Sequence, residues 1–312
     1  MRVLTDQLQF PEGPVWLKDG SLLVVEIRRK TLTRIWPDGR VEVVVKLGGG
    51  PNGAAIGPDG HCYVANNGGF SFVQRADGVW VSAGTPTDYV KGRIERVNLA
   101  TGAFEEVYDQ VPVGPDIEPV RGPNDLVFDA HGGFYFTDPG KTRHRTMDRG
   151  KICYAKADGS VIRELIAPIY KPNGIGLSPD GNTLYAVETE TARLWAWDLA
   201  EPGILARPST ASPSSPHGSR LLYTAPSYMR FDSLAVEANG NICIGTLDAG
   251  GITVCSPEGK LVEFVPVPGD THCTNICFGG ADMKKAYVTQ SYAGRLVELD
   301  WARPGLKLCY EA

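Results

Sequence analysis

The sequence lacks the features that mark membrane, secreted and nucleic-acid-binding proteins. No run of eighteen apolar residues occurs in the 312 positions, and the first residues contain no apolar stretch typical of a signal peptide. The formal net charge is −5 with both signs interspersed, so no basic surface for nucleic acid or an anionic membrane is predicted. These absences predict a cytoplasmic protein.

Common catalytic motifs and helical periodicity are also missing. The sequence has no Gly-x-Ser-x-Gly elbow, Walker loop or Rossmann fingerprint, which leaves serine-hydrolase and nucleotide-binding functions without support. Apolar residues at helical spacing are nearly absent, which argues against a βαβ fold. The seven cysteines, an odd number, lie mostly within predicted strands, which indicates buried reduced thiols rather than a disulfide framework.

The sequence does contain one internal repeat. Asn173 begins a short apolar strand that ends at the turn Asp180-Gly181 seven positions later, and a second apolar strand, residues 184–187, follows. The same pattern occurs six times, each time with a polar residue seven positions before the turn residue. These polar residues, which we call the polar ring, are Glu12, Asn52, Asn124, Asn173, Asp232 and Asn275.

The repeat predicts the fold. Each copy continues into two further short strands, so a unit has four strands at a basic period of about 40 residues, as in a propeller blade. Leucine-rich solenoids have shorter periods, and a sandwich would not repeat in this register. We therefore predict an all-β protein, a single domain over residues 1–312. The predicted domain is a six-bladed β-propeller of four-stranded blades around a central channel.

Two of the repeats are longer than the others. Successive polar-ring residues are 40, 72, 49, 59 and 43 positions apart, so we place insertions at residues 67–91 of the second blade and at about residues 201–219 of the fourth. Because strands alternate in direction, we expect the two insertions at opposite ends of the propeller. Residues 67–91, the aromatic insertion, should share an end with the polar ring and roof a substrate pocket. Packing onto the second blade is the alternative. Its aromatic residues are Phe70, Phe72, Trp80 and Tyr89.

The polar ring predicts a metal site. Its residues open the innermost strand of each blade and so surround one mouth of the channel, where carboxylate and amide oxygens suit a hard cation such as Ca²⁺. Asn before Gly is also a common turn residue, which is an alternative explanation for Asn52 and Asn173. It does not explain Glu12 or Asp232, whose carboxylates would repel each other without a positive charge between them. We predict one divalent metal ion, Ca²⁺ first, with Zn²⁺, Mn²⁺, Mg²⁺ or Fe²⁺ as alternatives.

Four motifs give the sequence a family resemblance. Residues 10–16 (FPEGPVW), 122–126 (GPNDL), 136–139 (FTDP) and 172–175 (PNGI) resemble the gluconolactonase/senescence marker protein (regucalcin) family. By the same resemblance, paraoxonases and diisopropylfluorophosphatase would be more distant relatives. The resemblance covers essentially the whole chain and implies the same six-bladed fold and lactonase activity. It also implies that Glu12, Asn173 and Asp232 bind the metal, with Asn124 either a fourth ligand or a substrate contact.

The predicted function is metal-dependent hydrolysis of a lactone, with the ion polarising the carbonyl. Asp232 can face both metal and water and is the candidate proton acceptor, while roles as nucleophile or as ligand alone stay open. Two alternatives are a phosphotriesterase-like hydrolase, whose ring would bind a phosphoryl oxygen, and a non-enzymatic binding propeller. We expect a small-molecule lactone as substrate and neither nucleic acid nor a membrane as partner. The oligomeric state is not predicted.

Four other residues are candidates for contacting the substrate. Asp138, in a Thr-Asp-Pro motif, can support the site or only cap a turn. Arg121 and His272 lie in connections that enter blades at this mouth, and His272 is a candidate proton shuttle. Trp80 belongs to the aromatic insertion. Sugar-lactonase members of the family carry an Arg two residues before the Asn of this motif. Gly122 holds that position here, with Arg121 one residue further back, which argues against a sugar-type substrate.

Overall fold

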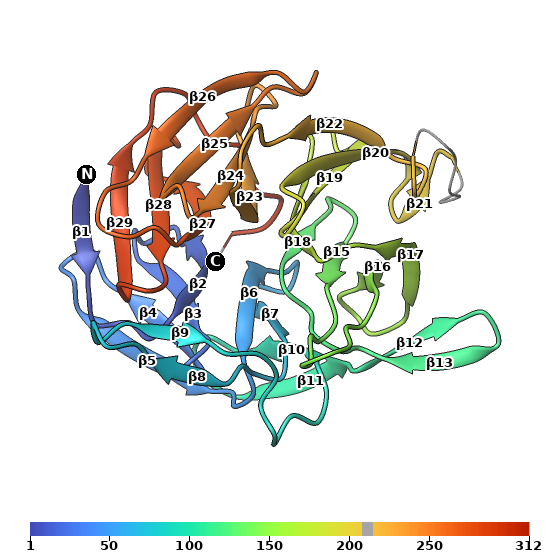
Figure 1. Ribbon diagram of the computed structural model, residues 1–312, viewed down its shortest axis with the longest axis horizontal. Helices are drawn as coiled ribbons and strands as arrows, with labels where there is room; N and C mark the ends of the chain where they lie inside the picture. Colours follow the sequence, from blue (N-terminus) through green and yellow to red (C-terminus); the bar gives the residue numbers. More distant parts are fainter. Residues whose placement is uncertain (208–214, 312) are drawn as a thin grey trace.

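Six antiparallel blades surround a central channel (Figure 1). The structure is a computed structural model that describes residues 1–207 and 215–311. Strands are the only regular elements in the described residues, and no helix among them could cross a membrane. The predicted all-β, six-bladed propeller is confirmed.

Each blade runs outward from the channel in sequence order, except that the outermost strand of blade six is the N-terminal β1. Blade one contains β2 (Pro11–Trp16), β3 (Leu22–Glu26), β4 (Thr31–Ile35) and β5 (Val41–Lys46). Blade two contains β6 (Pro51–Ile56), β7 (Cys62–Asn66), β10 (Arg93–Val97) and β11 (Phe104–Tyr108). Blade three contains β14 (Leu126–Phe128), β15 (Gly133–Asp138), β16 (Gly150–Lys156) and β17 (Ile162–Ile169). Blade four contains β18 (Pro172–Leu177), β19 (Thr183–Glu188), β20 (Arg193–Glu201) and β22 (Arg220–Thr224), with the short β21 (Ile204–Leu205) paired to β20; blade five contains β23 (Arg230–Val236), β24 (Ile242–Leu247), β25 (Gly251–Cys255) and β26 (Leu261–Pro266); blade six contains β27 (Cys273–Gly279), β28 (Lys285–Gln290), β29 (Arg295–Asp300) and β1 (Arg2–Thr5).

The N-terminal strand closes the propeller. β1 is the outermost strand of blade six and pairs with β29, with Val3 opposite Val297. The last blade therefore takes one strand from the beginning of the chain and three from its end. This arrangement joins the first and last blades by backbone hydrogen bonds as well as by side-chain packing.

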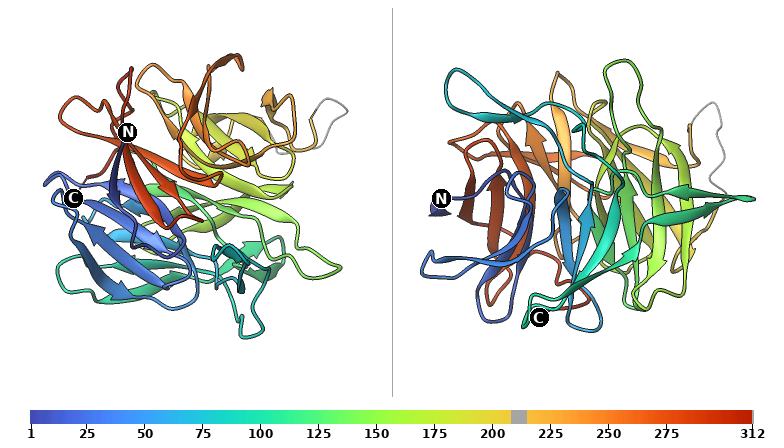
Figure 2. Two further views of the ribbon diagram at one scale, coloured as in Figure 1. Left: turned by 60° about the vertical axis from the view of Figure 1, so that its left-hand side comes forward. Right: turned by 90° about the horizontal axis from the view of Figure 1, so that it is seen from below.

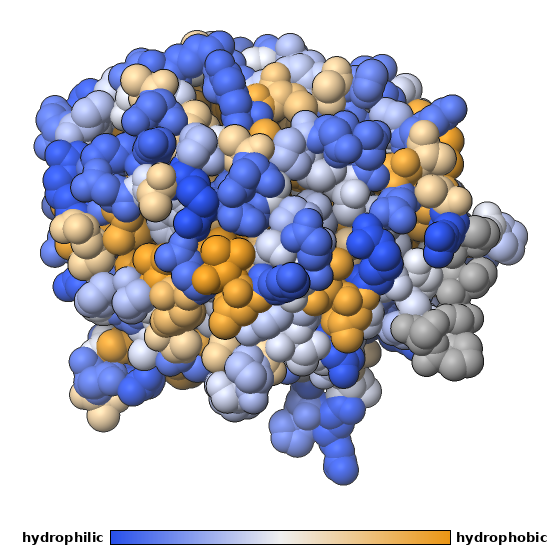
Figure 3. Space-filling model, turned by 90° about the horizontal axis from the view of Figure 1, so that it is seen from above, coloured by the Kyte–Doolittle hydropathy of each residue, from blue (hydrophilic) through white to orange (hydrophobic). Residues whose placement is uncertain are grey.

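The hydrophobic core is divided among the junctions between blades. The described residues form six buried clusters, one between each pair of neighbouring blades. Inner strands such as β6 and β18 are buried along their whole length, whereas outer strands such as β5 and β26 are largely exposed. Figure 3 shows the result on one side of the molecule, where apolar side chains lie in small groups among hydrophilic ones. Successive side chains of a buried strand pack against opposite neighbours, which explains the nearly continuous apolar runs.

Glycines allow the inner strands to approach one another. In three blades the residue after the polar-ring residue is a glycine: Gly13, Gly53 or Gly174. A Cβ added at any of them would lie closer than 3.0 Å to backbone atoms of the next blade. Inner strands are therefore in backbone contact at this level, which brings the polar residue before each glycine close to the channel axis.

The aromatic insertion contains a hairpin of β8 (Phe72–Gln74) and β9 (Trp80–Ser82). It lies at one end of the propeller and the C-terminus at the other (Figure 2). A second hairpin, β12 (Gln110–Val113) with β13 (Asp116–Pro119), joins blades two and three. This hairpin was not predicted: its strands are too short to stand out in the sequence, so the 72-residue spacing was assigned to one insertion. The insertion of blade four lies between β20 and β22 as predicted, and its residues 208–214 lie outside the described residues.

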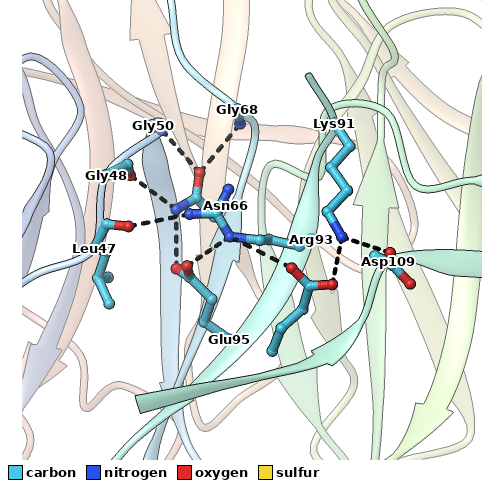
Figure 4. Close-up of polar contacts among 10 residues, drawn as sticks. Leu47, Gly48, Gly50, Asn66, Gly68, Lys91, Arg93, Glu95 and Asp109 are labelled. Carbon is cyan, nitrogen blue, oxygen red and sulfur yellow. Dashed lines mark hydrogen bonds and ion pairs between the residues drawn. The ribbon is translucent and has the colours of Figure 1, made fainter. Parts of the chain in front are cut away.

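A buried polar network holds the base of the aromatic insertion (Figure 4). Asn66, at the end of β7, accepts hydrogen bonds from the backbone N–H groups of Gly50 (2.8 Å) and Gly68 (3.1 Å). Its amide nitrogen donates to Glu95 Oε2 at 2.9 Å, and Arg93 Nε donates to the other oxygen of Glu95 at 2.6 Å. The network fixes where the insertion leaves blade two and where the chain returns to it.

Candidate functional site

The polar ring surrounds the channel mouth as predicted by the repeat. Its residues lie on β2, β6, β18, β23 and β27 or, for Asn124, two positions before β14. Asn124 is half-buried and the other five are buried, with Glu12 3 % and Asp232 8 % exposed. Such burial removes most of the water that would otherwise hydrate the two carboxylates, so their environment decides their charge.

A third carboxylate, Asp125, joins Glu12 and Asp232. Burial raises the pKa of Asp125 and of Asp232 to about 7. Burial, then the charge of Asp232 and the weaker influence of Asp125, raise the pKa of Glu12 well above its usual range. Asp125 was not among the predicted site residues, because the repeat marks one polar residue per blade. The signal was the two adjacent polar residues in Asn124-Asp125 at the start of an inner strand.

Two oxygens in this region have no hydrogen-bond donor. Glu12 Oε2 and Asn124 Oδ1 are buried and lack a partner among the described residues. Asn173 is oriented by its neighbours: its amide nitrogen donates to Thr189 Oγ1 at 3.0 Å, and its Oδ1 accepts a bond from Ser233 Oγ at 3.4 Å. Buried acceptors without donors, beside carboxylates with raised pKa values, are the groups that a hard cation would satisfy. The residues present fit such an ion.

The described residues contain no group of three His, Cys, Asp or Glu side chains with the arrangement of a metal site. The predicted ligand set has only two carboxylates, Glu12 and Asp232, and takes its other oxygens from the amides Asn124 and Asn173.

The two remaining ring residues use their oxygens within the protein. Asn52 donates to the backbone oxygen of Asn124 at 3.3 Å and accepts from Asn67 Nδ2 at 3.1 Å. Asn275 Oδ1 accepts the N–H of Ile276 at 2.8 Å. Both amides therefore brace the mouth. Asn52 lies within β6 and bonds to other segments, so its side chain does not act as that of a turn residue.

Asp138 holds the entry to blade three. Its carboxylate accepts three backbone N–H groups, those of Arg121 (2.9 Å), Gly122 (2.7 Å) and Gly140 (3.0 Å). Glu188 plays the same part at blade four, where it accepts the N–H of Tyr170 at 3.0 Å. Residues at the ends of second strands thus fix the connections between blades. A substrate contact by Asp138 stays a prediction.

The guanidinium of Arg121 points to the hairpin of β12 and β13. It lies 3.5 Å from Glu118 on β13. The backbone oxygen of Arg121 accepts a hydrogen bond of 2.5 Å from the hydroxyl of Tyr89, which belongs to the aromatic insertion. Arg121 therefore links the insertion to blade three through its backbone and pairs its charge outside the polar ring.

His272 lies in an aromatic and basic surrounding at the mouth. Its ring stacks on Tyr292 with centroids 3.4 Å apart, and its Nε2 is 3.4 Å from the guanidinium of Arg230. Arg230 in turn donates two hydrogen bonds to Asp248, of 2.9 and 3.0 Å. Burial, followed by the charge of Arg230, lowers the pKa of His272 to about 4. The imidazole is therefore neutral near pH 7, and its role as a proton shuttle stays a prediction.

Each aromatic ring of the insertion has a partner outside blade two. Phe72 meets Phe10 at 5.2 Å between centroids, Trp80 lies 4.7 Å from the guanidinium carbon of Arg28, and Phe70 and Tyr89 each lie 4.9 Å from the ammonium nitrogen of Lys141. Two of these partners belong to blade one and the third follows β15 in blade three. The insertion thus extends over neighbouring blades at the end that carries the polar ring.

Fold and site together define a class of protein, a six-bladed β-propeller with carboxylate and amide side chains gathered at one channel mouth. The chain belongs to the family described as SMP-30/Gluconolactonase/LRE-like region, which matches residues 10–292. This match confirms the family resemblance.

Two sequence relatives are lactone-hydrolysing enzymes by name. The gluconolactonase of Zymomonas mobilis is 27 % identical over 304 residues, which cover 89 % of this chain and 76 % of that enzyme. The lactonase Drp35 of Staphylococcus saprophyticus is 30 % identical over 146 residues, 47 % of this chain and 42 % of that lactonase.

Solved structures show the same fold. XC5397 of Xanthomonas campestris, a gluconolactonase, aligns with a TM-score of 0.72 and 22 % identity over 96 % of this chain and 88 % of its own. Regucalcin of Agrobacterium tumefaciens, a calcium-binding protein, aligns with a TM-score of 0.73 and 20 % identity over 98 % and 97 %. At these identities the likeness supports the fold and not the site.

Proposed function

We propose that the protein hydrolyses the ester bond of a small-molecule lactone at the polar ring, with the help of one divalent cation, Ca²⁺ first. The observation that carries the proposal is a pair of buried oxygens, Glu12 Oε2 and Asn124 Oδ1, that have no donor in the described part of the chain and lie beside carboxylates with raised pKa values. Membership of the family and the lactonase relatives support the reaction class.

Glu12, Asn173 and Asp232 would hold the ion, with Asn124 as a fourth ligand or a substrate contact. When bound, the ion supplies positive charge that polarises the lactone carbonyl and lowers the pKa of water. The protein contributes orientation, since Thr189 and Ser233 fix the amide of Asn173. Asp232 is buried beside these groups and takes the proton from the attacking water.

The test is metal analysis of the purified protein followed by chelation and re-addition. We expect one divalent ion per chain, loss of lactone hydrolysis on chelation, and recovery with Ca²⁺. Thermal unfolding without substrate should shift upward when Ca²⁺ is added, because the ion binds only the folded protein. Hydrolysis that persists in full after chelation would contradict the role of the ion. A phosphotriester panel run in parallel separates the two hydrolase classes, and failure on both panels would favour a binding propeller.

Stabilisation by Ca²⁺ should grow with pH. In the ion-free protein Asp125 and Asp232 have pKa values of about 7, above those of an unfolded chain, so the folded state holds protons that unfolding releases. Stability of the ion-free protein therefore falls as pH rises from about 4 to about 7 and is then level. Ca²⁺ competes with these protons, so its effect on Tm should be small near pH 5 and large near pH 8. Equal shifts at both pH values would contradict the proposal.

The aromatic insertion should favour a lactone less polar than an aldonic sugar lactone. Its rings lie at the end that carries the polar ring, and the nearby guanidinium of Arg121 is paired with Glu118. We expect Trp80→Ala to lower kcat/KM for an alkyl-substituted lactone about tenfold, with little change for gluconolactone. Tyr228→Ala, at an exposed residue, is the control. Equal loss on both substrates, or a lower Tm alone, would assign Trp80 to packing on Arg28.

A further inference from the structure

The central channel contains a cavity of about 420 Å³. It lies between the polar ring and the opposite end of the propeller. Inner strands of all six blades contribute to its lining. Asp125 and Asn275 line it near the ring, and residues 306–311 line it at the opposite end. Its volume lies in the range of pockets that bind small molecules. We call this space the channel chamber, and the proposed lactone hydrolysis does not use it.

Small side chains keep the chamber open. The residues that line it from the inner strands include Ala55, Val127, Gly176, Ala235 and Cys277. Val127, Ala235 and Cys277 are partly exposed on strands whose neighbouring residues are buried, because their side chains border the chamber. The wall is therefore mainly apolar. Water gains few hydrogen bonds in such a space, which favours an apolar occupant.

The C-terminal segment crosses the far opening. Leu306 N–H donates to Val236 O at 2.8 Å, and the hydroxyl of Tyr310 accepts the N–H of Gly132 at 3.0 Å. The ring of Tyr310 meets Phe128 edge-on, with centroids 5.7 Å apart. The segment thus spans from blade five to blade three. In Figure 1 the C-terminus lies near the centre of the ring of blades, and Figure 2 places it at the end opposite the aromatic insertion.

The charged residues around the chamber favour a ligand with positive rather than negative charge. Lys307 is the only lysine or arginine among the lining residues, and it is paired with Glu311 at 3.3 Å. The acidic lining residues at the far end are Asp129, Asp180, Glu201 and Glu311, of which Glu311 is also 4.0 Å from Lys18, while Asp125 lies near the ring. An anion would be repelled by this set, whereas a cationic group at the end of an apolar chain would be attracted.

We propose that the channel chamber binds the alkyl chain of a linear alkylammonium ion, with the chain between the inner strands and the ammonium group at the acidic far end. The apolar wall accounts for the chain, and the excess of carboxylates accounts for the charge. The site lies behind the polar ring and is separate from the proposed catalytic mouth.

Calorimetry with three probes tests both parts of the proposal. Octylammonium should bind, while octanoate, with the same chain and opposite charge, and putrescine, with charge and no apolar end, should each bind at least tenfold more weakly. Ala235→Phe and Val127→Phe, which fill the chamber from blades five and three, should weaken octylammonium at least tenfold. Trp80→Ala, at the other end of the propeller, should leave it unchanged. Equal binding of octylammonium and octanoate, or no binding, would overturn the proposal.

A measurement on the unmodified protein covers the case in which the filled variants do not fold. The Cys277 thiol lines the chamber, so octylammonium should slow its reaction with a small neutral thiol reagent several-fold. Peptide mass spectrometry separates Cys277 from the exposed Cys309. Unchanged reactivity of Cys277 at saturating octylammonium would place the ligand elsewhere and overturn the proposal.

Discussion

Replacing Asp232 by Asn is expected to lower lactone hydrolysis by about 10²–10⁴-fold, because an amide cannot take the proton of the attacking water. The fold should persist, since the substitution keeps the size and shape of a buried side chain. Metal content, kcat and thermal unfolding should be measured together. Asp248→Asn, at a carboxylate of the same mouth that pairs with Arg230, is the matched control and should lose less than tenfold. Near-normal turnover in Asp232→Asn would remove Asp232 from proton transfer.

Asp232→Asn is expected to lower activity without lowering the stability of the ion-free protein. In the ion-free protein Asp232 has a pKa of about 7, so its charged form is disfavoured in the folded state above that pH. A neutral amide removes this penalty, and the ion-free variant should be at least as stable as the wild type near pH 8. Lower activity with equal or higher Tm is the signature of a functional carboxylate rather than a structural one. A large drop in Tm would assign the loss of activity to unfolding.

Gly53→Ala should destabilise the propeller by on the order of 3 kcal/mol, the largest effect of a single methyl group that we expect here. The added Cβ would lie closer than 3.0 Å to backbone atoms of Asn124 and Asp125 in the next blade. That backbone has little freedom to move, because Asn124 N–H donates to Thr137 O at 2.9 Å and Asp125 N–H to Thr137 Oγ1 at 3.2 Å. Unfolding in denaturant measures the effect.

Gly60→Ala is the control for the inner-strand contact. Gly60 has φ of +75° in a turn, and an added Cβ there would have no neighbour within 4 Å. Gly60→Ala should lower the free energy of unfolding by about 1 kcal/mol, because alanine disfavours this backbone conformation. A loss for Gly53→Ala no greater than for this control would mean that the inner strands are not in contact as described.

The sequence alone determined the architecture and the end of the propeller that carries the polar ring. Both follow from local periodicities: residues alternate between two faces of a strand, and a turn residue recurs seven positions after each polar residue. Six copies of such a unit can bury their apolar faces only against one another, so the repeat was enough to predict six blades. The placement of Glu12 and Asp232 at one mouth followed from the same register.

The tertiary structure decided what depends on contacts between distant residues. β1 completes blade six because both ends of the chain meet there, and no local pattern marks an outermost strand. Asp125 joins Glu12 and Asp232 because three blades converge on the axis. Asn52 is braced by Asn67, whereas the side-chain oxygen of Asn124 has no donor among the described residues, although the two side chains are chemically the same. Hydrogen bonding and burial are properties of neighbours in space, and the sequence order of this chain does not contain them.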